Sequence, residues 1–168
     1  MTGGIRKLVA RVATTSAAAV VALTLVPLGS ATAEPSVQSQ LSSLRNATAA
    51  YHSLPAAEAD GFVPLLGCFD SAAGGMGQHF FIPSRMGVVS LNEPTALVYE
   101  PHDGRFNLVA VEYIVPGPAD MTPPHLLGRD FTYLSALGVW KLHAWIFRPN
   151  PAGMFADYNP NVRACPTG

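Results

Sequence analysis

Clusters of basic residues are missing from this chain after its first residues. The 168 residues contain 10 Lys and Arg against 11 Asp and Glu, and no basic run follows Arg11. Proteins that bind nucleic acids or anionic membranes need such clusters to contact phosphate groups. We therefore expect no nucleic-acid partner and no charge-driven anchoring to a membrane surface.

The short motifs of several enzyme classes are absent as well. There is no Gly-x-Ser-x-Gly elbow of the kind that serine hydrolases use. Gly74, Gly75 and Gly77 are not followed by Lys-Ser or Lys-Thr, so they do not form a phosphate-binding loop. A turn before a strand is the simpler interpretation of these glycines. The question of catalysis stays open.

Long apolar runs are limited to one, residues 17–28. At about 12 residues this run is too short for a membrane span, which needs about 20, but it fits a signal peptide. It follows the basic residues Arg6, Lys7 and Arg11 and precedes an Ala-Thr-Ala cleavage pattern at residues 31–33. We expect a signal peptide over residues 1–33, a single globular domain over residues 34–168, secretion to an extracytoplasmic location, and no stable membrane anchoring after cleavage.

Cysteine is scarce. The chain has 2 cysteines, Cys68 and Cys165. In an exported protein an even pair is most simply a disulfide. We expect one disulfide that ties the end of the chain back to its first strands.

The remaining pattern predicts an α+β fold. Apolar residues spaced three and four apart from Leu41 to Tyr51 indicate an amphipathic helix, and Pro55 opens a second short helix over residues 56–60. Extended runs follow at residues 63–70, 78–82, 95–101, 106–115 and 138–147. We expect N-terminal helices packed on a curved, mainly antiparallel sheet with proline- and glycine-rich loops. Residues 125–128 and 131–137 are expected to hold short helical turns in a flap.

One hairpin has a clear signature. Asp103-Gly104 stands between two alternating runs and indicates a two-residue turn. An unbroken register pairs Tyr99 with Leu108, Val98 with Val109 and Leu97 with Ala110. This register puts Glu112 on the same apolar face as Leu97 and Tyr99.

A carboxylate on an apolar face needs a partner or a raised pKa. Glu112 is therefore the most informative residue of the sequence. A structural ion pair with Arg129 or Arg148, or a bond with a buried hydroxyl, is one interpretation. A role in ligand binding, metal binding or acid–base chemistry is the other.

Two other strands also carry a single ionisable group, His79 and His143. If the strands meet, His79, Glu112 and His143 form the minimal ligand set for a divalent metal such as Zn or Fe. No two of these residues stand at a short fixed spacing typical of metal motifs. The same three side chains could instead form a structural polar network.

The alternative function is a non-catalytic envelope module that binds a small molecule or a sugar. Aromatic platforms and polar anchors would then form the site, with Glu112, Tyr113, Trp145 and His125 as ligand-binding residues. His125 would reach the site from the flap. Core packing is the competing interpretation of the aromatic residues.

Four segments carry a resemblance to known proteins: residues 75–80 (GMGQHF), 111–114 (VEYI), 142–145 (LHAW) and 150–165 (NPAGMFADYNPNVRAC). Together they resemble a group of small exported bacterial proteins of uncharacterised function, with the pattern GMGxH[YF], EY, LHxW, NPxGxF, NP and C in this order. The resemblance covers about residue 47 to Cys165 and implies no activity. It associates His79, Glu112 and His143 with the motifs of the group. The group has Tyr at the position of Phe80.

Overall fold

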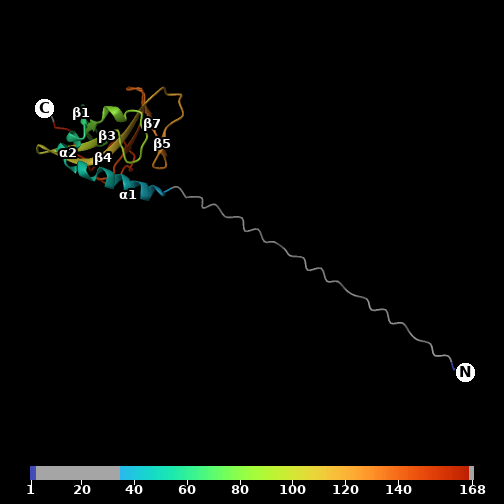
Figure 1. Ribbon diagram of the computed structural model, residues 1–168. Helices are drawn as coiled ribbons and strands as arrows, with labels where there is room; N and C mark the ends of the chain where they lie inside the picture. Colours follow the sequence, from blue (N-terminus) through green and yellow to red (C-terminus); the bar gives the residue numbers. More distant parts are fainter. Residues whose placement is uncertain (3–34, 167–168) are drawn as a thin grey trace. The chain divides into compact units, whose positions relative to one another are not determined.

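The computed structural model describes residues 1–2 and 35–166. The signal peptide expected over residues 1–33 and its cleavage site lie outside the described residues, apart from residues 1–2. The chain from Glu34 onward forms one compact unit. Its architecture is the expected α+β arrangement of N-terminal helices on a curved antiparallel sheet (Figure 1).

The helices form where the sequence predicts them. Helix α1 (Val37–Thr48) begins at Ser36, whose hydroxyl accepts a hydrogen bond from the amide of Ser39. A short 3-10 segment, η1 (Ala49–His52), and helix α2 (Leu54–Ala59) follow, with a proline in the first turn of α2. The buried face of α1 carries Leu41, Leu44 and Thr48. The apolar spacing of the sequence therefore identified the face that packs on the sheet.

The main sheet has six antiparallel strands in the order β1-β2-β3-β4-β8-β7. The strands are β1 (Val63–Ser71), β2 (Gly74–Phe81), β3 (Ala96–His102), β4 (Arg105–Pro116), β7 (Thr132–Leu134) and β8 (Val139–Ala144). A short 3-10 segment, η2 (Pro83–Arg85), lies between β2 and β3. A separate two-stranded hairpin is formed by β5 (His125–Leu126) and β6 (Arg129–Asp130). The helical turns predicted over residues 125–128 and 131–137 are therefore wrong. Leu127 and Gly128 adopt positive φ angles of 54° and 70°, which closes a tight hairpin, and residues 132–134 pair with β8 as strand β7.

The hairpin of β3 and β4 is confirmed, but its predicted register fails beyond Tyr99. Asp103 and Gly104 have φ angles of 49° and 73°, as the expected two-residue turn requires. Tyr99 pairs with Leu108, but the next pair is Val98 with Ala110. Val109 is thus an extra residue in β4, a β-bulge. A bulge exchanges the faces of all later residues relative to the partner strand.

The bulge corrects the position of Glu112. Glu112 pairs with Ala96 and therefore lies on the face of Ala96, not on the predicted face of Leu97 and Tyr99. The face of Leu97 and Tyr99 packs against Leu41 and Leu44 of α1 and forms the largest apolar core. Glu112 points to the other side of the sheet.

The C-terminal tail covers part of this second face. Trp145 and Val162 pack there against Val98, Val109 and Ala110. The disulfide between Cys68 and Cys165 joins the end of the tail to β1, as predicted.

The glycine segment before His79 is strand rather than turn, because it pairs with β1, and the tail lies directly against it. The amide of Gly75 donates to the carbonyl of Val162 (3.1 Å), and the amide of Asn159 donates to the carbonyl of Gly75 (2.9 Å). A Cβ atom at Gly75 would overlap the backbone of Arg163. Glycine is needed here for the close approach of two backbones.

Candidate functional site

His79, Glu112 and His143 come together on the face of the sheet opposite the helices. His143 of β8 is the direct cross-strand partner of Glu112 in β4. His79 of β2 pairs with Val98, which lies on the same face. The Nε2 atom of His79 lies 3.4 Å from Oε2 of Glu112, and the rings of His79 and His143 are 6.0 Å apart. The convergence expected from the sequence is therefore present.

Burial sets the protonation states of the three side chains. Loss of water raises the pKa of Glu112 from 4.5 to about 7; the nearby Lys141 lowers it and Asp157 raises it. Burial, with a smaller contribution from Lys141, lowers the pKa of His79 to about 4. Burial lowers the pKa of His143 well below its ordinary value, with the neighbouring His79 and Lys141 acting in the same direction. At neutral pH both imidazoles are uncharged, and Glu112 is divided between its acid and its carboxylate.

The imidazoles are incompletely hydrogen-bonded within the described part of the chain. Nδ1 of His79 and both ring nitrogens of His143 are buried without a partner there. The ring of His143 has His79 and Trp145 as neighbours, and the centroids of the His143 and Trp145 rings are 4.5 Å apart. A buried polar atom without a hydrogen bond costs about 1–3 kcal/mol.

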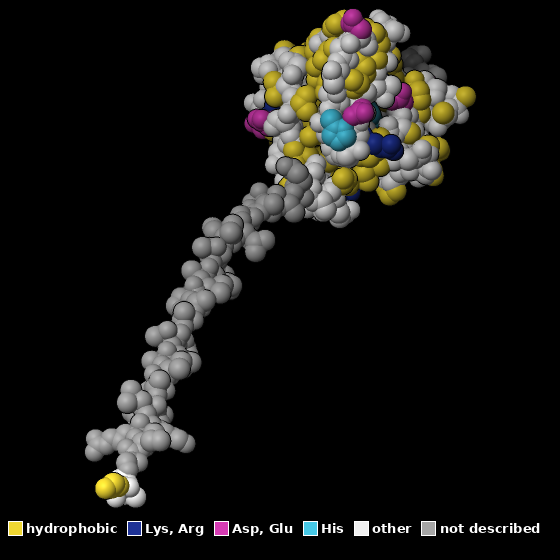
Figure 2. Space-filling model, turned by 90° about the vertical axis from the view of Figure 1, so that its right-hand side faces the viewer, with side chains coloured by type: hydrophobic (Ala, Val, Ile, Leu, Met, Phe, Trp, Pro, Cys, Tyr) yellow, Lys and Arg dark blue, Asp and Glu magenta, His cyan; other side chains and the backbone are white. Residues whose placement is uncertain are grey.

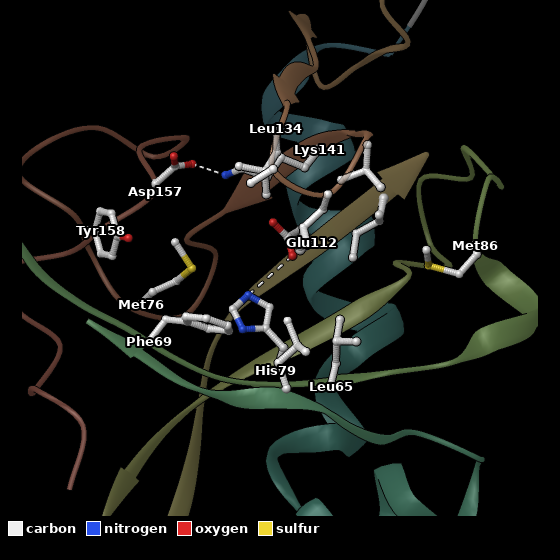
Figure 3. A pocket seen from close by; sticks show the side chains of 15 residues that line it. Leu65, Phe69, Met76, His79, Met86, Glu112, Leu134, Lys141, Asp157 and Tyr158 are labelled. Atoms are coloured by element: carbon white, nitrogen blue, oxygen red, sulfur yellow. Dashed lines mark hydrogen bonds and ion pairs between the residues drawn. The ribbon is translucent and has the colours of Figure 1, made fainter. Parts of the chain in front are cut away.

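His79 and Glu112 line a cavity of about 570 Å³. Its walls are almost entirely apolar and come from β1, β2 and the loop after it, β4, β7, β8 and their connecting turn, and the tail. The apolar and aromatic lining residues are Leu65, Leu66, Phe69, Met76, Met86, Ile114, Leu134, Ala136, Leu137, Val139 and Tyr158. Figure 3 shows His79 and Glu112 side by side within this lining, with their contact drawn as a dashed line. We call it the main cavity.

The mouth of the main cavity carries exposed apolar side chains. Leu66 and Leu137 are 62% and 60% exposed, and Phe69 is 37% exposed. On the molecular face drawn in Figure 2, Lys and Arg side chains are isolated among hydrophobic ones and do not form a patch. A ligand that reaches the cavity therefore meets an apolar entrance.

An ion pair stands in the wall of the main cavity. Lys141 of β8 is buried, and its ammonium group contacts the carboxylate of Asp157 from the tail (Figure 3). The same two residues also line a second, more polar cavity of about 320 Å³, which His143 reaches as well. Neither Lys141 nor Asp157 is among the site residues predicted from the sequence. The alternation along residues 138–147, which puts Lys141 on the face of His143, was the available signal for Lys141.

Three of the predicted ligand-binding residues lie away from the main cavity. Tyr113 is on the opposite face of the sheet, in the core beneath the helices, and its hydroxyl donates to the carbonyl of Leu91 (2.6 Å). Trp145 is buried, and its indole N–H donates to the carbonyl of Ala156 (2.6 Å). His125 is exposed on β5 and pairs with Asp130. Only Glu112 of the predicted ligand-binding set lines the main cavity.

The arginines considered as partners of Glu112 are engaged elsewhere. Nη2 of Arg148 lies 2.7 Å from Oε2 of Glu100, and Arg129 lies over the ring of Phe155. The described residues thus provide Glu112 with no arginine partner. They also contain no group of three or more His, Cys, Asp or Glu side chains arranged to hold a metal ion.

Comparison with known proteins gives no relative: no family model, no curated protein and no solved structure matches the chain. Among the described residues, the helices are all too short or too polar to cross a bilayer. The disulfide is compatible with an extracytoplasmic protein.

Proposed function

We propose that the protein binds a small, mostly apolar molecule in the main cavity, with Glu112 and His79 contacting its polar group. The observation that carries this proposal is the position of two buried ionisable side chains inside an otherwise apolar cavity. Small-molecule sites have this composition: apolar walls and a few polar groups that orient the ligand. The volume of about 570 Å³ lies within the usual range for such sites.

Glu112 and His79 would gain hydrogen bonds from a ligand in the main cavity. Among residues 35–166, the one ion-pair contact of Glu112 is with His79, which is uncharged at neutral pH. A ligand that hydrogen-bonds to Glu112 or His79 would replace the lost hydration of these groups. The apolar part of the ligand would cover Leu66, Phe69 and Leu137 at the mouth.

We further propose that the protein works outside the cytoplasm. The leader-like residues 1–33, the disulfide and the resemblance to small exported bacterial proteins support this location. A binding module of the cell envelope or the medium agrees with all three. Enzymatic turnover is not part of the proposal.

A fluorescence titration with N-phenylnaphthylamine, a neutral apolar fluorophore, tests the main cavity directly. We expect its emission to rise with the wild-type protein and to stay low with Ala136→Trp, which places an indole in the lining. The control is Ala59→Trp, an exposed position on α2 outside the lining. No binding by the wild type, or equal binding by Ala136→Trp, would contradict the proposal.

A divalent metal, Zn or Fe, at His79, Glu112 and His143 is the second candidate. The unpartnered ring nitrogens of His143 and the neutral state of both imidazoles favour it, because metals bind neutral imidazole. The side chains would have to move closer, since their present arrangement is not that of a metal site. Elemental analysis after incubation with zinc, beside His143→Ala and the exposed control His52→Ala, decides it. Equal zinc in both variants would rule out this site.

A further inference from the structure

The charges around the main cavity point to the class of its ligand. Four of its lining residues are acidic or basic: His79, Glu112, Lys141 and Asp157. Lys141 and Asp157 neutralise each other as an ion pair. His79 stays neutral because burial lowers its pKa to about 4. Glu112 is therefore the lining residue whose charge is left without a counter-charge.

We infer that the ligand is a lipophilic amine whose ammonium group pairs with the Glu112 carboxylate while its apolar part fills the cavity; this inference rests on the proposed binding function. The ammonium group supplies the positive charge that the lining lacks. The Coulomb attraction between the two charges is stronger in such an apolar site than in water. Glu112 has already lost its water on folding, so the remaining cost is the desolvation of the ammonium group.

A carboxylate ligand fits less well. Its natural partner in the lining would be Lys141, but that ammonium group is already held by Asp157. The ligand would also bring a second negative charge close to Glu112, and like charges at short range disfavour binding. A neutral alcohol would bring no counter-charge to Glu112 and gain only a hydrogen bond.

The side chains around Glu112 also suit a cation. Figure 3 shows Phe69 and Met76 beside His79, on the side of the cavity from which Tyr158 also projects. The rings of Phe69 and His79 are 6.0 Å apart and meet edge to face. Aromatic faces attract ammonium groups.

Three ligands of equal chain length separate the effect of the head-group charge on binding from the effect of the apolar chain. They are decylamine, decanol and decanoic acid. Each is titrated against the complex with N-phenylnaphthylamine at neutral pH. We expect decylamine to displace the fluorophore at least about tenfold more tightly than decanol, because a charge-assisted bond contributes more than a neutral one. Decanoic acid should bind most weakly.

The isosteric variant Glu112→Gln should abolish the preference for decylamine while decanol still binds. Glu93→Gln, an exposed acid outside the lining, is the matched control and should keep the wild-type preference. Titration calorimetry of the wild type in two buffers of different ionisation enthalpy gives a second measurement that needs no variant. Since burial raises the pKa of Glu112 to about 7, pairing with an ammonium group should release protons, and the release should be larger at pH 6 than at pH 8.

The outcomes separate the two proposals. Equal affinity for amine and alcohol, a preference for decanoic acid, or an amine preference that survives in Glu112→Gln would overturn the inference and leave the apolar cavity as a binding site. Amine binding without proton release would overturn the assignment to Glu112. Failure of all three ligands and of the fluorophore would overturn both proposals.

Discussion

Lys141 and Asp157 form an ion pair in the wall shared by two cavities. Both residues line the main cavity and the smaller polar one that His143 reaches. The pair comes from distant parts of the chain, since Lys141 belongs to β8 and Asp157 to the tail. It fixes the tail against the sheet, and Asp157 opposes the effect of the Lys141 charge on the pKa of Glu112.

Asp157→Asn should therefore change both stability and ligand preference. Lys141 is buried and would lose its counter-charge, while Asp157 is half-exposed, so we expect a loss of about 1–2 kcal/mol in the free energy of unfolding. The freed ammonium group would favour the ionised form of Glu112 and lower its pKa. The preference for decylamine over decanoic acid should shrink.

Urea denaturation and the three-ligand titration measure these effects. Asp130→Asn is the control, because Asp130 lines the polar cavity but pairs with the exposed His125. A variant with unchanged stability and unchanged preference would show that the Lys141–Asp157 pair has neither role.

The pH dependence of stability should have two opposing parts. The pKa of Glu112 is raised from 4.5 to about 7 in the folded state. Its contribution to the free energy of unfolding is therefore complete below pH 4.5 and is lost as the pH rises to about 7. The pKa of His79 is lowered from 6.5 to about 4, so its contribution is complete above pH 6.5 and is lost as the pH falls to about 4. Each amounts to about 3 kcal/mol.

Denaturation of the wild type, Glu112→Gln and His79→Gln across this range separates the two parts. The stability of the wild type relative to Glu112→Gln should fall by about 3 kcal/mol as the pH rises through the range of Glu112. The stability of the wild type relative to His79→Gln should rise as the pH rises from about 4 to 6.5. Parallel curves for all three proteins would contradict the burial of these charges.

Gly75→Ala should be strongly destabilising. A methyl group at Gly75 would overlap the backbone at Arg163 and the side chain of Val162. We expect a loss of about 2–4 kcal/mol, because the tail must move away from β2. Gly67→Ala is the matched control, since nothing lies within 4 Å of a Cβ atom at that position. Thermal unfolding of the two variants compares them; equal melting temperatures would mean that the tail adapts freely.

Tyr113→Phe tests the separation of the two faces of the sheet. Its hydroxyl donates to the carbonyl of Leu91 (2.6 Å) beneath the helices, so its removal should cost about 1 kcal/mol of stability. Binding of N-phenylnaphthylamine should not change, because Tyr113 does not line the main cavity. A change in affinity without a change in stability would place Tyr113 in the site after all.

The sequence predicted the helices, the hairpin turn and the disulfide because these depend on local spacing or on a single pair of residues. It also brought His79, Glu112 and His143 together, because side chains of one parity in neighbouring strands share a face. The face itself could not be predicted. The bulge at Val109 determines which face carries Glu112, and no residue type near Val109 indicates a bulge.

The main cavity was not visible in the sequence for a related reason. Its lining comes from segments as distant as Leu65 and Tyr158, and their approach depends on where the tail crosses the sheet. Gly75 marks that crossing, but a glycine before a strand indicates a turn just as readily. Tyr113 and Trp145 were assigned to a ligand because aromatic residues serve cores and binding sites equally well.

The tail also sets an order of events during folding. Every strand of the main sheet ends before residue 157, so the strands can pair before Asp157 reaches Lys141. Until then Lys141 has no counter-charge from the tail, and the wall that Asp157 and Tyr158 complete is open. The last residues of the chain therefore close the main cavity as well as anchoring the tail.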